Sequence, residues 1–142
     1  MDEISEAVIK LEFLQGYRFR MTFNLEGVPD ILVDEPKPTG EGFGPGPTRL
    51  LSAAVGHCLS SSLLYCLRKA KIEVRGLEAT VKASTARNDE GRLRVRSIDV
   101  QIDLDVSEGD RVRLARCLEL FENYCTVTQS VRKGIEVNVK VT

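Results

Sequence analysis

The sequence predicts an α+β fold in which antiparallel strands surround one long, buried helix. Stretches of alternating apolar and polar residues lie near both ends of the chain and in its middle, as in half-buried strands. A single segment, from Thr48 to about Lys71, is apolar on most sides, which is typical of a helix inside a core or between subunits. The order is strands, long helix, hairpin, helix and strand, without an internal repeat. That order favours mostly antiparallel pairing.

Length and charge narrow the class of protein. At 142 residues the chain is expected to form a single domain, residues 1–142. Its 20 Lys and Arg oppose 21 Asp and Glu, and this balance argues against a nucleic-acid binder or a polybasic membrane binder. No apolar run is expected to span a bilayer, and the acidic opening lacks the pattern of a signal peptide. We therefore expect a cytoplasmic protein with no nucleic-acid or membrane partner.

The first third of the chain predicts a small sheet followed by a loop. Residues 5–34 indicate two or three strands, the clearest of which is the alternating segment Tyr17–Leu25 after a turn at Gln15–Gly16. Residues 35–47 contain four Pro and four Gly, which excludes a helix or a strand there. Because the strands cannot bury their apolar face alone, we interpret this segment as an ordered loop.

The remaining elements have recognisable start and turn signals. Pro47 is expected to open the long helix, because a proline in the first turn loses no hydrogen bond. The helix would be roughly 36 Å long, which exceeds the expected diameter of the domain and favours a partner chain over the overhang. Residues 88–91, Asn-Asp-Glu-Gly, predict a hairpin turn, and Ser107 with Asp110 predicts the start of a second helix. A last strand is expected over residues 135–141.

Four cysteines are the candidates for chemistry: Cys58, Cys66, Cys117 and Cys125. In a chain expected to be cytoplasmic, they are expected to be reduced thiols rather than a structural disulfide frame. Zinc is not expected, because Cys58 and Cys66 would lie about 12 Å apart on one helix. The lone His57 would point about 100° away from Cys58, so no Cys–His dyad is implied. A histidine at a helix or subunit contact is the simpler interpretation.

The spacing of the cysteines limits which of them can meet. Eight residues separate Cys58 from Cys66, and eight separate Cys117 from Cys125. Antiparallel packing of the two helices would bring Cys58 to Cys125 and Cys66 to Cys117, whereas parallel packing would exchange the partners. A third interpretation is that all four are small buried hydrophobic residues, as free cysteines often are. Cα–Cα distances beyond about 7 Å would exclude disulfide geometry for the antiparallel pairs.

Two segments that each contain a cysteine are similar to sequence motifs of a known protein family. Residues 46–58 read GPTRLLSAAVGHC, in which a helix begins after a proline, runs through Leu-Leu-x-Ala-Ala and carries a cysteine. Residues 124–127, Tyr-Cys-Thr-Val, are similar to a Cys-Pro-Val motif and are followed by a short helix. Together these segments resemble the OsmC/Ohr family of osmotically inducible and organic-hydroperoxide-resistance proteins. The likeness extends from about residue 5 to the end, in the same order of elements.

The resemblance implies a structure and an activity. The structure would be an intertwined homodimer with the long helices at its centre and the active site at the subunit interface. The activity would be thiol-dependent reduction of small hydroperoxides, organic ones and also hydrogen peroxide. Cys58 matches the peroxidatic cysteine, which becomes a sulfenic acid, and Cys125 matches the resolving cysteine, which condenses with it to a disulfide. An external dithiol would restore both thiols, and no metal or organic cofactor is required.

The group that would activate the thiol departs from the family pattern. The family has a Glu directly after the helix-opening proline, paired with an Arg that holds the cysteine ionised, but this chain has Thr48 there. Lys37 is the only basic residue of the preceding loop, and Glu41 is a candidate replacement for the missing acid. The candidate activating cations are Arg18, Arg20 and Arg49.

These departures leave a second function open. The helix expected after Cys125 would favour a thiolate at that residue, so physical reasoning alone would make Cys125 the nucleophile, whereas the resemblance assigns that role to Cys58. A non-enzymatic or divergent dimer that binds a small ligand or senses redox state is the alternative to the peroxidase. Thr48 favours this alternative, and the presence of both matched cysteines favours the peroxidase.

Overall fold

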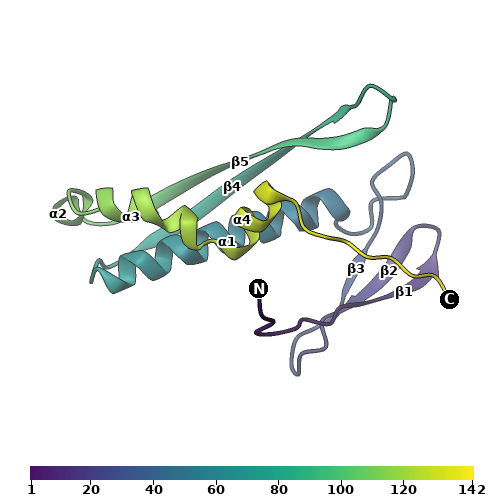
Figure 1. Cartoon of the computed structure of the whole chain (residues 1–142), viewed down its shortest axis with the longest axis horizontal. Coiled ribbons are helices and arrows are strands. Elements are labelled where there is room, and N and C mark those ends of the chain that lie inside the picture. Colours follow the sequence, from purple (N-terminus) through teal and green to yellow (C-terminus); the bar gives the residue numbers. More distant parts are fainter. The chain divides into compact units, whose positions relative to one another are not determined.

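The computed structural model describes all 142 residues, which form two compact units, Met1–Leu50 and Leu51–Thr142. The first unit contains an antiparallel sheet of order β1–β2–β3 (Figure 1), made of β1 (Lys10–Gln15), β2 (Arg18–Thr22) and β3 (Ile31–Val33). Gly16, between β1 and β2, has a φ of 56°, a conformation that glycine adopts without strain. The strands and the turn predicted within residues 5–34 are thus confirmed.

The segment rich in Pro and Gly is an ordered loop within the first unit, as expected. The buried carboxylate of Asp34 accepts the backbone N–H groups of Glu41 (3.3 Å) and Phe43 (3.2 Å). Gly40 and Gly44 lie so close to backbone carbonyl groups that neither position has room for a Cβ. The glycines therefore permit close packing of the loop, and Asp34 replaces the hydrogen bonds that a strand would have provided.

Helix α1 (Pro47–Lys69) begins at the predicted proline. It ends where Lys71 adopts a φ of 60°. The N–H of Ile72 then bonds to the carbonyl of Leu67 at 2.9 Å, and that of Lys71 bonds to the carbonyl of Arg68 at 3.0 Å. These two bonds satisfy carbonyl groups that a helix end leaves free. The predicted helix is confirmed to within two residues at its end.

By length and composition alone, α1 could also cross a membrane. The expectation that no segment is long and apolar enough was therefore wrong. The match is weak, because a helix in a protein core passes the same test. Apolar residues of α1 do belong to both core clusters of the second unit.

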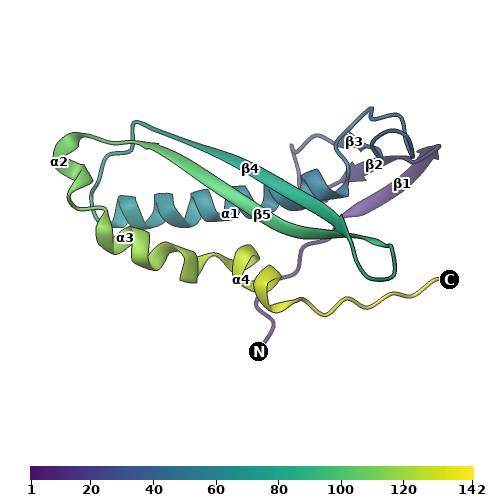
Figure 2. The same cartoon turned by 90° about the horizontal axis from the view of Figure 1, so that it is seen from above.

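The hairpin predicted in the middle of the chain is present. Strands β4 (Gly76–Arg87) and β5 (Leu93–Asp105) pair antiparallel along their full length, with one irregularity between Ser84 and Thr85. In the turn, Asn88 Oδ1 accepts two backbone N–H groups at 3.0 Å, and Gly91 has a φ of 77°. Figure 2 shows the hairpin extending along α1.

The expected second helix is divided into short pieces. These are α2 (Glu108–Arg111), α3 (Ala115–Leu120), the 3₁₀ helix η1 (Phe121–Tyr124) and α4 (Thr126–Lys133). Ser107 caps α2 as predicted, because its Oγ accepts the N–H of Asp110 at 3.2 Å. Both views show α3 and α4 along α1, and the chain runs through them in the direction opposite to α1 (Figures 1 and 2).

The strand predicted over residues 135–141 is absent. This segment has no regular structure, and its apolar side chains are exposed, from 62% at Ile135 to 90% at Val141. A strand needs a neighbour that pairs with its backbone N–H and C=O groups, and no other strand of this chain pairs with it. The alternating pattern was therefore insufficient to predict a strand within a single chain.

The core of the second unit consists of two clusters along α1. The first surrounds the C-terminal end of α1 and consists of Leu63, Leu67, Ile72, Val106, Leu114 and Cys117. The second surrounds the preceding turns of α1 and consists of Val55, Leu59 and Cys125. Each cluster thus contains one cysteine from the C-terminal segments. This arrangement positions the candidate site.

Candidate functional site

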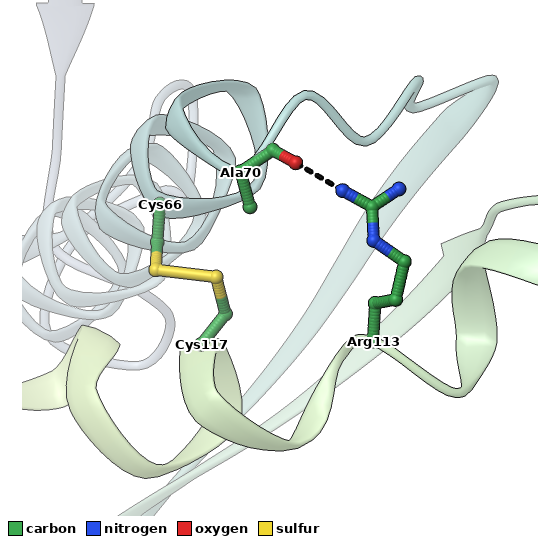
Figure 3. Close-up of a disulfide and its surroundings, with 4 residues drawn as sticks. All are labelled: Cys66, Ala70, Arg113 and Cys117. Carbon is green, nitrogen blue, oxygen red and sulfur yellow. Dashed lines mark hydrogen bonds between the residues drawn. A yellow bond between two sulfur atoms is a disulfide. The ribbon is translucent and has the colours of Figure 1, made fainter.

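The four cysteines form two pairs between α1 and the segments that run antiparallel to it. Cys66 and Cys117, which we call the disulfide pair, are covalently joined with Cα atoms 5.7 Å apart (Figure 3). Cys58 and Cys125, which we call the thiol pair, are free and hydrogen bonded to each other. The antiparallel pairing predicted from the eight-residue spacing is confirmed, and the parallel one is excluded.

The expectation that all four cysteines are reduced thiols was wrong for the disulfide pair. The C-terminal segments pack on α1 in the direction that brings Cys66 and Cys117 within the Cα–Cα range of a disulfide. The interpretation of the four cysteines as buried hydrophobic residues is incomplete for the same reason. Cys117 and Cys125 do belong to the two core clusters, but each also has a cysteine partner.

The two sulfurs of the thiol pair differ in access. Cys125 is completely buried and packs with Val55 and Leu59. Cys58 is only partly buried on α1. A solute can therefore reach the sulfur of Cys58 first, and it can reach Cys125 only through Cys58 or after a local opening.

The N-terminus of α4 directs its donors at both sulfurs. Cys125 is the N-cap of this helix, and the first N–H groups of a helix have no partner within it. The N–H of Val127 lies 3.5 Å from Cys58 Sγ, and the N–H of Thr126 also contacts that sulfur. Cys125 Sγ hydrogen bonds to Thr128 Oγ1 at 3.0 Å, and the backbone of Thr128 also favours negative charge on that sulfur. The helix therefore favours negative charge on both sulfurs, and not only on Cys125 as the sequence suggested.

The pKa of Cys58 is raised above the ordinary value of a thiol. Burial is the main cause, because it disfavours the charged form. The hydrogen bond with Cys125 raises this pKa further, while the N–H groups of Val127 and Thr126 lower it. In the resting pair, Cys58 therefore keeps its proton.

The pKa of Cys125 is lowered. Burial alone would raise it, but hydrogen bonds to the sulfur outweigh burial. These come from the hydroxyl of Thr128, from Cys58, from the N–H of Thr128 and from Ser62. The first negative charge of the pair therefore forms on Cys125, with Cys58 as the hydrogen-bond donor.

The candidate activating residues all belong to the first unit. Arg18 forms an ion pair with Glu41 at 3.9 Å, and its guanidinium lies 4.0 Å from the centre of the Phe43 ring. Arg20 pairs with Glu12 at 3.6 Å, and Arg49 is exposed in the first turn of α1. The thiol pair belongs to the second unit. None of the main contributions to the pKa of either thiol comes from an Arg or Lys.

Sequence reasoning missed Thr128, Ser62 and a cavity beside the thiol pair. The sequence does contain a pattern that points to Thr128. This residue stands three positions after the N-cap cysteine, which is the spacing at which N-cap and N3 residues contact each other. Ser62 stands four residues after Cys58, on the same face of α1. The cavity measures about 440 Å³ and is lined largely by apolar residues, among them Val55, Leu59, Ile98, Val100 and Phe121, with Thr128 at its wall.

The structure contains no group of three or more His, Cys, Asp or Glu side chains that could hold a metal ion. His57 is exposed on α1.

Solved structures of known proteins have the same fold. An OsmC-like protein of unknown function from Vibrio cholerae is 16% identical over 89% of this chain and 94% of its own, with a TM-score of 0.77. An organic hydroperoxide resistance protein from Legionella pneumophila is 15% identical over 92% of each chain, with a TM-score of 0.68. The organic hydroperoxide resistance protein OhrB of Bacillus subtilis is 18% identical over 93% of this chain and 94% of its own, with a TM-score of 0.63.

At these identities the likeness establishes the fold, a mixed helical and antiparallel-sheet fold. No curated protein sequence matches the chain. The family itself is established by the sequence, since the model of the family described as OsmC-like protein matches residues 39–140. This range contains α1, the hairpin and all four cysteines. The chain therefore belongs to the OsmC-like protein family.

Proposed function

We propose that the protein is a thiol-dependent peroxidase that reduces organic hydroperoxides through the thiol pair. The observation that carries this proposal is the hydrogen-bonded contact between two free cysteines, one accessible and one sealed in the core. Membership in the OsmC-like family supports it, as does the similarity to the Legionella and Bacillus proteins, which are organic hydroperoxide resistance proteins.

In the first step, Cys58 attacks the peroxide. Once Cys125 is ionised, it accepts the proton of Cys58 along their hydrogen bond and acts as a general base. The Cys58 thiolate attacks the terminal oxygen of the hydroperoxide, and the O–O bond breaks. The alkoxide that leaves takes the proton from Cys125 and becomes the alcohol, while Cys58 becomes a sulfenic acid. The N–H groups of Thr126 and Val127 stabilise the charge on Cys58 during this step.

In the second step, Cys125 resolves the sulfenic acid. Its thiolate attacks the sulfur of Cys58, and hydroxide leaves and takes a proton from the solvent. Over the two steps, the peroxide gains two electrons and the two cysteines lose them, because the cysteines are converted to a disulfide. An external dithiol then restores both thiols by two exchange reactions. This step needs no large motion, because the two side chains already share a hydrogen bond.

The cavity beside the thiol pair supports organic hydroperoxides as the main substrates. It borders Val55, Leu59 and Thr128, which also contact Cys125 or pack with it. Its largely apolar wall suits an alkyl or aryl group, and its volume of about 440 Å³ lies within the range of small-molecule sites. Hydrogen peroxide would gain nothing from such a wall and is proposed as a poorer substrate.

We also propose that the protein works as a homodimer. Large apolar side chains are exposed along the C-terminal segment, for example Val137 at 79% and Val139 at 83%. A partner strand would satisfy the backbone of residues 135–141, which has no neighbour within the chain. Light scattering during size-exclusion chromatography should give about twice the mass of one chain, 15.8 kDa. A monomeric mass would overturn this part of the proposal.

The two-cysteine cycle can be tested by mass spectrometry and thiol counting. The protein, with its disulfide pair intact, is treated with one equivalent of cumene hydroperoxide. The wild type should lose both free thiols, Cys125→Ser should gain one oxygen, and Cys58→Ser should not react. The double variant Cys66→Ser/Cys117→Ser is the matched control and should also lose both of its thiols.

Two outcomes would contradict this cycle in different ways. A wild type that keeps both free thiols would exclude the peroxidase. An oxygen gained by Cys58→Ser, with none gained by Cys125→Ser, would reverse the roles of the two cysteines.

A redox sensor is the second candidate, and two observations favour it. The pKa of Cys58 is raised, and Thr48 occupies the position of the activating acid. A sensor would react once and then persist in the oxidised form. With excess hydroperoxide and a dithiol, a peroxidase should consume many equivalents per chain, whereas a sensor should consume about one.

A further inference from the structure

The disulfide pair lines a second cavity of the second unit, of about 790 Å³. The two cavities share no lining residue, although Ser62, which hydrogen bonds to Cys125, lines this one. Both Cys66 and Cys117 contribute to its wall. The same wall contains three basic and three hydroxyl-bearing side chains: Lys69, Arg113, Arg116, Ser61, Tyr65 and Tyr124.

The wall of this cavity is positively charged. Lys69, Arg113 and Arg116 line it, and no Asp or Glu does. Arg113 is already engaged, because it bonds to the carboxylate of Asp110 at 2.9 Å and donates to the carbonyl of Ala70 at the end of α1 (Figure 3). The side chains of Lys69 and Arg116 form no ion pair or hydrogen bond. The cavity therefore has two cations without a counter-charge, which would attract an anion.

The same wall offers hydroxyl donors and a reactive bond. Ser61, Tyr65 and Tyr124 line the cavity, and both tyrosines are well exposed. Hydroxyl and cationic groups together suit carboxylates. Cys66 is partly buried and Cys117 is 3% exposed, so the sulfur of Cys66 is the accessible end of the disulfide. A disulfide in an open cavity is a target for an incoming thiolate.

We propose that this cavity binds a small thiol that carries carboxylate groups, and that the bound thiol exchanges with the Cys66–Cys117 disulfide. The incoming thiolate attacks Cys66 Sγ, the bond to Cys117 breaks, and Cys117 leaves as a thiolate. A second thiolate attacks the sulfur of the bound molecule, which releases its disulfide and the Cys66 thiolate. Two small thiols are thereby oxidised, and the pair gains two electrons. The reaction uses neither Cys58 nor Cys125 and goes beyond the proposed peroxidase.

The charge of the thiol is the variable that tests this site. The wild type is incubated with 3-mercaptopropionate, 2-mercaptoethanol and cysteamine, which are anionic, neutral and cationic. Each rate of mixed-disulfide formation is divided by the rate of the same thiol with a small reference disulfide. The corrected rate should be about tenfold higher for the anionic thiol than for the neutral one at low salt. It should fall to within about twofold at about 0.5 M salt. Glutathione, which carries two carboxylates, is expected to behave as an anionic thiol.

Variants and peptide mapping locate the effect. Lys69→Gln/Arg116→Gln should remove most of the preference, whereas Arg68→Gln should retain it, because Arg68 is exposed on the same helix but does not line the cavity. Chymotrypsin cleaves after aromatic residues, so it separates Cys66 from Cys58 at Tyr65 and Cys117 from Cys125 at Phe121. The adduct should be found on the Cys66 peptide.

Three results would overturn the proposal. The first is an equal corrected rate for the three thiols in the wild type. The second is an equal loss of preference in Arg68→Gln and in the double variant. The third is an adduct confined to Cys58, which would place the exchange at the thiol pair. Circular dichroism of each variant verifies that the fold is intact, and no hydroperoxide is present, so these results are independent of peroxidase activity.

Discussion

The thiol pair and the disulfide pair are built from the same spacing on the same helix, yet they differ in chemistry. In each, one cysteine lies on α1 and the other on a segment that runs antiparallel to it. Cys117 lies inside helix α3, whereas Cys125 is the N-cap of α4. Only the second position leaves free N–H groups beside the sulfurs. The spacing of the cysteines therefore determines which of them form pairs, whereas the end of the neighbouring helix determines whether a sulfur in the pair is favoured as a thiolate.

The largest effect should come from removing the covalent bridge. The disulfide pair joins residues 51 apart, and a bridge over a loop of that length contributes about 4 kcal/mol in the chain-entropy estimate. Cys66→Ser/Cys117→Ser should therefore lower the free energy of unfolding in urea by about this amount. A reductant should lower that of the wild type similarly and should not affect the double variant.

Cys58→Ser is the matched control for this difference between the pairs, with an expected loss below about 1 kcal/mol because its side chain is only partly buried. If the two changes lower the free energy of unfolding by the same amount, the covalent bond does not contribute to stability, and the two pairs do not differ in this respect.

The second prediction concerns the packing of α1 against β4 near the thiol pair, where no covalent bridge joins the segments. A Cβ on Gly56 would lie 2.5 Å from Cγ2 of Val81 on β4. The repulsion outweighs the better helix propensity of alanine, so Gly56→Ala should cost about 1–2 kcal/mol. Thermal unfolding measures the change.

Gly109→Ala provides the comparison, because Gly109 lies in α2 and a Cβ there meets open space. This change should stabilise the protein by up to about 1 kcal/mol. Equal effects of the two substitutions on stability would show that the close approach of α1 to β4 does not exclude a larger side chain at Gly56.

The smallest expected change is in the ionisation of the thiol pair. Thr128→Val removes a hydroxyl that donates to the Cys125 thiolate, so the pKa of Cys125 should rise. The ultraviolet absorbance of the thiolate, followed against pH, should therefore appear at higher pH than in the wild type. The reaction with hydroperoxide should also slow most at the low-pH end, where the base is lost first.

Thr126→Val is the control for that titration, because Thr126 acts on Cys58 through its backbone N–H and its side chain is exposed. Its titration should match the wild type. A shift as large as that of Thr128→Val would assign the effect to the helix as a whole.

Much of this fold could be predicted because its signals are local. Pro47 begins α1, Ser107 caps α2, and the turn before Gly91 closes the hairpin, and each depends on only a few neighbouring residues. The pairing of the cysteines also followed from their spacing, once the direction of packing was known.

The unpredicted features depend on contacts that a local pattern does not contain. Residues 135–141 alternate like a strand, but a strand requires a partner that this chain does not supply. The oxidation of Cys66 and Cys117 depends on the distance between two segments. The identity of an activating cation could not be predicted, and none of the main contributions to the pKa of either thiol comes from an Arg or Lys.

Along the chain, the disulfide pair lies between the two cysteines of the thiol pair. This order affects how readily Cys58 and Cys125 meet again after the segments that contain them have separated. The loop closed by Cys66 and Cys117 lies inside the loop that Cys58 and Cys125 would close. Without the bridge, Cys125 follows Cys58 by 67 positions along the chain. With the bridge in place, a shorter covalent path runs eight positions from Cys58 to Cys66, across the disulfide, and eight positions from Cys117 to Cys125. Loop-closure entropy then lowers the cost of bringing these two sulfurs together by about 1 kcal/mol, a several-fold gain in their effective concentration. The disulfide thus acts as a tether that returns Cys125 to Cys58 whenever the segments from α3 to α4 separate from α1.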